Sequence, residues 1–183
     1  MTGVLQGMRV VEGSAFVAVP LAGMTLAQMG AEVIRFDRIG GGLDAGRWPI
    51  APDGQSLFWA GLNKGKKSVA VDMKSPEGRE LISRIITAPG EDAGLFITNL
   101  RVRGWMDYET LSQRREDMVM VTLTGDRHGR PAVDYSVNPS LGGREIWPGT
   151  LRSATSGSPD GGRPSSGSVG AARGGRLICV PVA

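Results

Sequence analysis

The sequence has 183 residues and a mass of 19.3 kDa, and 40% of the residues are hydrophobic and 21% charged. This balance is typical of a globular domain and excludes disorder along the whole chain. The formal net charge of +3 comes from a glycine-rich stretch over residues 142–176, where five arginines stand against Glu145 and Asp160. The rest of the chain shows no surplus of basic residues that could form a nucleic-acid-binding face, so we expect no nucleic-acid partner.

Cysteine usage and the apolar segments indicate a cytoplasmic protein. The single cysteine, Cys179, excludes a framework of disulfides within the chain and favours a reducing compartment. The apolar run over residues 15–29 is too short to span a bilayer, and no basic segment of a signal peptide precedes it. We therefore expect no membrane partner.

Short apolar segments in the first 140 residues predict strands that alternate with helices. The expected strands cover residues 8–11, 32–37, 68–72, 95–98 and 118–123. A first helix is expected around Pro20, since proline suits the first turn of a helix, and Gly30 ends it. Residues 43–61 are expected to form a long irregular loop.

The second helix has the clearest start signal in the chain. Ser75 is a hydroxyl cap, Pro76 takes the first helical position, and Glu77 faces the positive end of the helix dipole. One apolar stripe follows, made of Leu81, Ile82, Ile85 and Ile86. Pro89 and Gly90 end this helix, and a third helix is expected over residues 108–115.

Strands that alternate with helices of about ten residues predict an α/β fold. The sheet is expected to be mainly parallel, covered on both faces, and doubly wound in the Rossmann-like manner, because parallel crossovers are right-handed.

The periodic pattern stops after Leu141. Residues 142–183 are rich in Gly, Ser and Arg, and this composition buries too little apolar surface to offset chain entropy. We therefore expect a folded domain over residues 1–141 and a disordered tail over 142–183. Residues 142–176 contain arginines but no lysine, which is what an out-of-frame reading of GC-rich DNA would produce. We therefore interpret the tail as a frameshift or truncation product.

Residues 61–68 contain two glycines and three lysines, but they do not match the phosphate-binding loop (P-loop) of nucleoside triphosphatases. The glycines are one residue too close, Lys67 stands where Ser or Thr should follow, and a strand rather than a helix comes next. Two interpretations stay open for this turn: an anion site, or a basic turn in solvent.

Other candidate residues carry little chemistry. The turn before Pro20 lacks the glycines of a dinucleotide site, so Asp37 is a strand-end residue rather than a ribose ligand. The lone histidine, His128, supports no metal site and is expected in a solvated loop. The tryptophans Trp48, Trp59 and Trp105 are interpreted as packing anchors, with a role beside an adenine or acyl group left open.

Polar and basic residues follow several of the predicted strands. In open α/β sheets, ligands bind beyond the carboxyl ends of the strands. The residues just past those ends include Arg38, Asn99, Arg101 and the pair Thr124 and Gly125. Arginine and lysine around backbone amides suit a ligand with several phosphates.

The same residues resemble the amino-terminal part of a family III CoA-transferase. The resemblance is carried by residues 5–12, 30–37 and 63–78, and it extends over about residues 4–141. Within the family, residues 12–18, 36–44 and 133–139 resemble a branch that moves CoA between two carboxyl carbons of one substrate. The resemblance implies a Rossmann-like domain, coenzyme A as part of an acyl-CoA substrate, no metal, and an interlocked homodimer for the full-length enzyme.

The resemblance also implies which residues contact CoA. They are Val17, Ala18, Arg38, Asn63, Lys64, Gly65, Lys66, Asn99, Leu100, Arg101, Thr124 and Gly125. Arg38, Lys64 and Lys66 would face the phosphates, and the neighbourhoods of Asn63 and Asn99 would hold the nucleotide.

The family uses an aspartate that attacks the thioester and becomes an aspartyl-CoA thioester through a mixed anhydride. Its expected position falls in the tail, where Asp160 is the one aspartate and lacks the family motif. We therefore assign no catalytic residue and keep Asp160 as a weak candidate. Two departures from the family pattern are Asp107, where an arginine is expected, and Val133, which replaces a histidine of the racemase branch.

Three functional interpretations follow. The first is the CoA-binding half of a CoA-transferase that lacks its nucleophile and is inactive alone. The second is a non-catalytic module that binds CoA or a nucleotide. The third is a complete enzyme in which Asp160, or an acid from a partner chain, acts as the nucleophile.

Overall fold

The computed structural model describes residues 3–125, 170–171 and 176–179. The chain divides into two compact units, one of residues 1–122 with 171–178 and one of residues 123–170 with 179–183. The helices that the structure describes all lie in the first unit.

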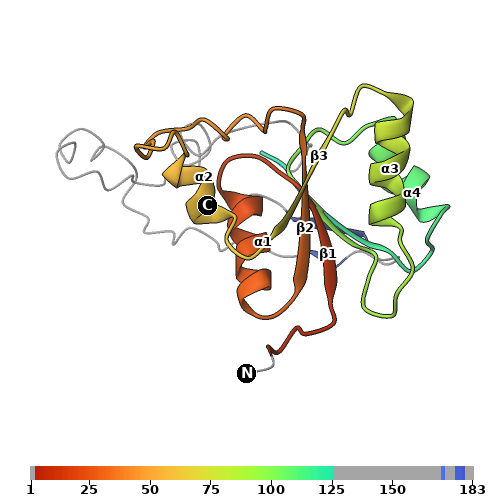
Figure 1. The fold of residues 1–183 in the computed structure, drawn as a ribbon. Coiled ribbons are helices and arrows are strands. Elements are labelled where there is room, and N and C mark those ends of the chain that lie inside the picture. Colours follow the sequence, from red (N-terminus) through yellow and green to blue (C-terminus); the bar gives the residue numbers. More distant parts are fainter. Residues whose placement is uncertain (1–2, 126–169, 172–175, 180–183) are drawn as a thin grey trace, which may run out of the picture. The chain divides into compact units, whose positions relative to one another are not determined.

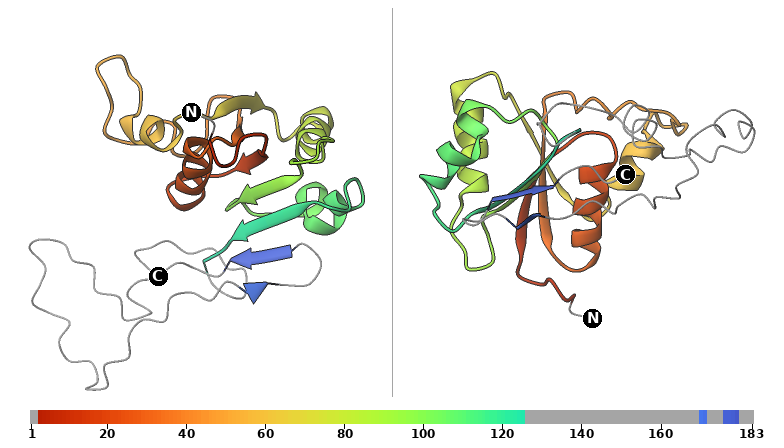
Figure 2. Two further views of the ribbon diagram at one scale, coloured as in Figure 1. Left: turned by 90° about the horizontal axis from the view of Figure 1, so that it is seen from below. Right: turned by 180° about the vertical axis from the view of Figure 1, so that it is seen from behind.

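Five strands of the sheet pair in parallel in the order β3-β2-β1-β4-β5, and two short strands, β7 (Arg176–Cys179) and β6 (Gly170–Ala171), follow β5 in the same sheet. The bounds of the five parallel strands are β1 (Arg9–Gly13), β2 (Glu32–Arg38), β3 (Lys67–Val71), β4 (Leu95–Thr98) and β5 (Val119–Leu123). Helix α1 (Ala18–Gln28) covers one face, and α3 (Pro76–Ile86) and α4 (Tyr108–Ser112) cover the other (Figure 1; Figure 2, left). The predicted doubly wound α/β fold is therefore confirmed.

Alternation along the strands divides the apolar side chains between the two faces. Val10 and Val33 pack on the α1 side with Leu26, whereas Val11 and Phe36 belong to the larger cluster on the α3 side. In that larger cluster the rings of Phe36 and Phe96 stack with their centroids 6.2 Å apart. Strand pairs such as Val10 with Val33 and with Leu95 fix the register, so the carboxyl ends of β1, β2 and β4 meet at one edge of the sheet.

Helix α3 begins as predicted. The Ser75 hydroxyl accepts a hydrogen bond from the backbone N–H of Gly78 at 3.0 Å, and Ile82 and Ile86 are completely buried. The prediction for Leu81 is wrong, because its side chain is 45% exposed and takes no part in the buried stripe. Helix α1 begins at Ala18, two residues before Pro20.

Two helical segments were not predicted. Helix α2 (Leu57–Leu62) lies in the expected loop, and the Ser56 hydroxyl caps it by accepting a hydrogen bond from Trp59 N at 3.1 Å. A 3-10 turn, η1 (Gly104–Met106), precedes α4. Both are short segments without a long apolar period, which is why the pattern did not predict them.

Within the segment expected to be a disordered tail, the structure describes two short strands, β6 (Gly170–Ala171) and β7 (Arg176–Cys179). The rest of that segment lies outside the described residues, so the predicted boundary at residue 141 stays a prediction. In the described part of the chain, no helix has the length and hydrophobicity needed to cross a membrane.

Candidate functional site

The loop after β1 is tied to the end of β4 at the carboxyl edge of the sheet. The Asn99 side chain accepts a hydrogen bond from Ala15 N at 2.9 Å and donates one to Ala15 O at 2.8 Å. The Thr98 hydroxyl donates to Gly13 O at 2.6 Å and accepts from Leu100 N at 3.0 Å. Three of these hydrogen bonds hold the two strand ends together, the fourth lies within the end of β4, and Asn99 acts as a backbone clamp.

The next residue, Phe16, has a left-handed backbone with φ of 63°. A bulky residue rarely adopts this conformation, and such strain persists only where surrounding contacts hold it. Here Asp44, from the loop after β2, accepts a hydrogen bond from Phe16 N at 3.1 Å. Val17 then takes the N-cap position of α1 and makes no side-chain hydrogen bond, so the residues that the structure describes supply no side-chain cap to the first N–H groups of that helix.

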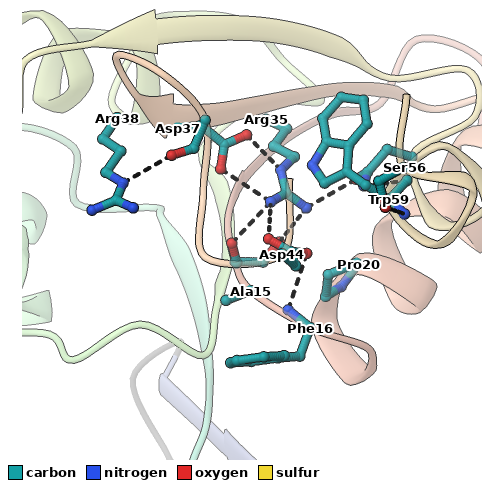
Figure 3. Close-up of polar contacts among 12 residues, drawn as sticks. Ala15, Phe16, Pro20, Arg35, Asp37, Arg38, Asp44, Ser56 and Trp59 are labelled. Atoms are coloured by element: carbon teal, nitrogen blue, oxygen red, sulfur yellow. Dashed lines mark hydrogen bonds and ion pairs between the residues drawn. The ribbon is translucent and has the colours of Figure 1, made fainter. Parts of the chain in front are cut away.

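Arg35 is the centre of a buried charge cluster beneath this edge (Figure 3). Its guanidinium donates to both carboxylate oxygens of Asp37 at 2.7 and 3.0 Å and lies 3.4 Å from Asp44 Oδ1. It also donates to Ser14 O and to the Ser14 hydroxyl, both at 3.2 Å. Burial opposes the charge on Arg35, but the hydrogen bonds and attraction from Asp37 outweigh it and raise the pKa of Arg35.

Glu12 and Lys66 complete the cluster as a buried ion pair. The Lys66 ammonium lies 2.8 Å from Glu12 Oε2, and the exposed fractions of the two side chains are 2% and 0%. Burial raises the pKa of Glu12 against the opposing hydrogen bonds from Lys66 and Ser14, and burial lowers the pKa of Lys66. The carboxylate also lies 3.6 Å from the Arg35 guanidinium.

The Asn63–Lys66 turn contributes side chains to the buried charge cluster. Lys66 Nζ donates to Glu12, to Pro20 O and to the Asn63 side chain at 2.8–2.9 Å, which uses all three ammonium protons. The Asn63 side chain also accepts from Arg35 at 3.0 Å and donates to Trp59 O at 2.8 Å. Lys66 is therefore a buried partner of Glu12, and Asn63 contacts Lys66, Arg35 and Trp59. The expected contacts of Lys66 with phosphates and of Asn63 with the nucleotide stay predictions.

Other expected contacts are exposed. Arg38 ends β2 and lies in solvent, where its Nε donates to Gly41 O at 2.8 Å. Lys64, Gly65 and Arg101 are also exposed, whereas Leu100 packs against the core on the α3 side. No ion pair with an acid is found for Arg38, Lys64 or Arg101 within residues 3–125. Gly65 has φ of 76° and lies beside Ala27 of α1.

The remaining sequence candidates divide into three groups. Thr124 and Gly125 directly follow β5. Asp107, the departure from the family pattern, caps α4 by accepting from Thr110 N at 2.8 Å. His128, Val133 and Asp160 lie outside the described residues.

The three tryptophans behave differently from one another. Trp105 packs against the core as expected. Trp59 is half-buried with Arg35 5.7 Å from its ring centre. The prediction that Trp48 is a packing anchor is wrong, because that residue is 80% exposed.

Sequence reasoning missed Glu12, Arg35 and Asp44 as parts of the site. The strand pattern does indicate two of them. Glu12 lies two residues after Val10 on one strand, and Arg35 lies two residues after Val33 on the next, so each charged residue shares a face of the sheet with a buried valine. Charged residues that share a face with buried valines in a covered sheet must pair with one another. Asp44 lies in a loop, where no periodicity indicates burial.

Comparison with known proteins shows which family and which proteins this chain resembles. Residues 5–162 match CoA-transferase family III. The chain is 64% identical to a 2-methylfumaryl-CoA isomerase of Chloroflexus aurantiacus over 143 residues, which cover 78% of this chain and 35% of that protein. It is 33% identical to a succinate–glutarate CoA-transferase of Agrobacterium fabrum, covering 72% of this chain and 35% of that one.

A solved structure shows the same fold. The crystal structure of a CAIB/BAIF family protein from Brucella suis matches with a TM-score of 0.68 and 28% identity, over 78% of this chain and 40% of that chain. The chain thus spans about a third of the length of the curated relatives described above.

Proposed function

This chain belongs to CoA-transferase family III, and on that premise we propose that the carboxyl edge of its sheet binds the CoA part of an acyl-CoA thioester. The observation that carries the proposal is the loop after β1. Asn99 and Asp44 hold it rigidly, yet the α1 N-terminus that follows has no side-chain cap. Backbone N–H groups at such a helix end favour an anion such as a phosphate.

Arg38 supplies the positive charge beside this helix end. It is exposed at the end of β2, and its Nε donates a hydrogen bond to Gly41 O, whereas its two terminal nitrogens have no hydrogen-bond partner among the residues that the structure describes. Arg101, after β4, is the second exposed cation that follows a strand at this edge. Guanidinium groups bind phosphate oxygens through paired hydrogen bonds, so these two arginines suit the phosphates of CoA.

For the reaction, we propose the transfer of CoA between the C1 and C4 carboxyl groups of mesaconyl-CoA, also called 2-methylfumaryl-CoA. The support is the 64% identity to a 2-methylfumaryl-CoA isomerase. An aspartate carboxylate attacks the thioester carbonyl and displaces the CoA thiolate, which leaves a mixed anhydride. The thiolate then attacks the aspartyl carbonyl, giving an aspartyl-CoA thioester and the free dicarboxylate, whose second carboxylate repeats the sequence in reverse.

The carboxylates beneath the edge do not supply the nucleophile of this reaction. Glu12 and Asp44 are fully buried, Asp37 is 8% exposed, and all three form ion pairs with Arg35. They hold the CoA-binding loop, and the nucleophile is a residue outside this cluster.

Calorimetric titration of the chain with CoA tests the binding function. We expect binding that weakens from low to moderate salt and that falls about tenfold in Arg38→Ala, since a hydrogen bond to a charged group contributes on the order of 1.5–3 kcal/mol. The matched control is Arg79→Ala, an exposed arginine on α3 that should leave the affinity unchanged. Equal losses in both variants, or no binding by the unmodified chain, would contradict the proposal.

A further inference from the structure

Arg47 lies against two aromatic rings next to the loop after β1. Its guanidinium carbon is 4.4 Å from the centre of the Phe58 ring and 5.6 Å from the centre of the Phe16 ring. Phe58 comes from α2, whereas Phe16 is the strained residue between β1 and α1. Two segments far apart in the sequence thus contact one arginine side chain.

The guanidinium of Arg47 has no acid partner among the residues that the structure describes. The residue is exposed, so its charge is hydrated rather than neutralised. By contrast, Arg35 in the neighbouring charge cluster pairs with two aspartates and is completely buried. Arg47 is therefore a cation in place beside the site without a counter-charge.

The N–H donors of the Arg47 guanidinium have no hydrogen-bond acceptor among the residues that the structure describes, although the group lies over two rings. Aromatic rings interact with the flat face of the group, whereas its N–H donors lie in the plane and point outward. The edge that carries these donors matches a carboxylate, which accepts two parallel hydrogen bonds from it. A ring-held arginine has also lost part of its rotamer freedom before a ligand arrives, which reduces the entropic cost of binding.

The backbone around Arg47 is fixed to the same structure that holds the CoA-binding loop. Arg47 N donates to Asp44 O at 3.1 Å, and Arg47 O accepts from the Ser56 hydroxyl. The Asp44 carboxylate in turn holds Phe16 N (Figure 3). Arg47 is therefore connected to Phe16 in two ways, through the contact with its ring and through the hydrogen bonds that pass by way of Asp44.

From this geometry we propose that Arg47 binds the free carboxylate of a dicarboxylic acyl group carried on CoA. The inference rests on the proposed CoA-binding function and goes beyond it by assigning the residue that selects acyl groups with a second carboxylate. In this role Arg47 is a specificity-determining residue: it contacts the acyl end of the ligand and leaves CoA itself untouched.

Two stable thioethers of CoA test the assignment by calorimetry. S-(3-carboxypropyl)-CoA carries the free carboxylate, and S-butyl-CoA is its uncharged counterpart of the same chain length. We expect the unmodified chain to bind the carboxylated ligand about tenfold more tightly, since the pair adds charge-assisted hydrogen bonds. In Arg47→Ala this preference should disappear while the affinity for CoA stays within about twofold. Arg47→Lys keeps the charge but loses the paired geometry and should show an intermediate preference.

The outcomes separate this inference from the proposed function. A preference for the carboxylated ligand that survives in Arg47→Ala would overturn the assignment, and so would an equal loss of affinity for both thioethers and for CoA. Equal binding of the two thioethers by the unmodified chain would overturn it as well, while CoA binding itself still stood. Failure of the unmodified chain to bind CoA would instead remove the proposed function and this inference with it.

Discussion

Lys66 and Glu12 form an ion pair that is almost completely enclosed, with side chains 2% and 0% exposed. Removing one partner of a buried pair leaves an uncompensated charge and typically costs about 3–5 kcal/mol. We expect Lys66→Met to lower the free energy of unfolding by that amount in urea denaturation. Lys64→Met, two residues earlier and exposed, should change it by no more than about 0.5 kcal/mol. Equal effects of the two substitutions would show that the pair does not form.

The raised pKa of Glu12 predicts a pH dependence with a definite sign. Burial raises it above its ordinary value of 4.5, so the folded state holds the proton more tightly than the unfolded state. The stability contributed by the protonated carboxyl is present below pH 4.5 and is lost as the pH rises through the raised pKa. The measured quantity is the free energy of unfolding of the unmodified chain minus that of the Glu12→Gln variant. This difference should decrease as the pH is raised above 4.5.

The subtraction removes the contribution of acidic groups that do not contact Glu12. Glu32 and Asp107 have lowered pKa values because of their hydrogen bonds to Lys67 and Thr110, and they titrate in both proteins alike. A difference that increases with pH over the same range would mean that the Glu12 pKa is lowered rather than raised in the folded chain.

At the residue scale, the sequence indicated the site but not the role of each side chain. Residue type and strand-end position drew attention to Asn99 and to the Asn63–Lys66 turn, whose side chains the structure brings to the carboxyl edge of the sheet. They did not distinguish Lys66, which is buried, from Lys64, which is exposed. That distinction depends on the packing of the turn beside α1, which places Lys66 Nζ 2.8 Å from Pro20 O.

Among the elements, α1 contains a glycine that the buried pair requires. A Cβ atom at Gly23 would lie 1.7 Å from Glu12 Oε2 and 3.3 Å from Lys66 Cε, so no side chain fits there. Gly61 of α2 has no neighbour within 4 Å of the same position. The two helical glycines differ only in what surrounds them.

Alanine substitutions at these glycines should therefore have opposite effects. Alanine is favoured over glycine in a helix by roughly 0.5–1 kcal/mol, which Gly61→Ala should show as a small gain in stability. Gly23→Ala should instead destabilise the chain by about 1–3 kcal/mol, because the added methyl group displaces the Glu12 carboxylate. Thermal or urea unfolding of both variants measures the contrast, and a gain in stability for Gly23→Ala would contradict the enclosed pair.

Long apolar runs and strong caps made most elements predictable. The strand over residues 95–98 and the start of α3 at Ser75 agree with the structure, since buried parallel strands are almost continuously apolar. Helix α2 was not predicted because it is six residues long and has no buried residue. The Ser56 cap is the one local feature that favours this helix. The same Ser56 hydroxyl also donates a hydrogen bond to Arg47 O.

For the whole molecule, the alternation of strands and helices was sufficient to predict a doubly wound sheet. Because crossovers between parallel strands are right-handed, few sheet topologies are possible once five parallel strands are expected. The charge cluster could not be derived in the same way, because it joins charged side chains separated by up to 54 residues through ion-pair contacts of 2.7–3.6 Å. The predicted division at residue 141 and the role of Asp160 fall outside the described residues and stay predictions.

If CoA binds at the carboxyl edge of the sheet, amide chemical-shift mapping of the isotope-labelled chain during a CoA titration will locate the site. We expect the largest changes at the ends of three strands: at Phe16–Ala18 after β1, at Arg38 and Gly41 at and beyond the end of β2, and at Asn99–Arg101 after β4. Arg114 and Glu80, paired on the surface 2.7 Å apart, provide the internal control and should not shift. Changes centred on that surface pair, or spread evenly over the sheet, would contradict the account.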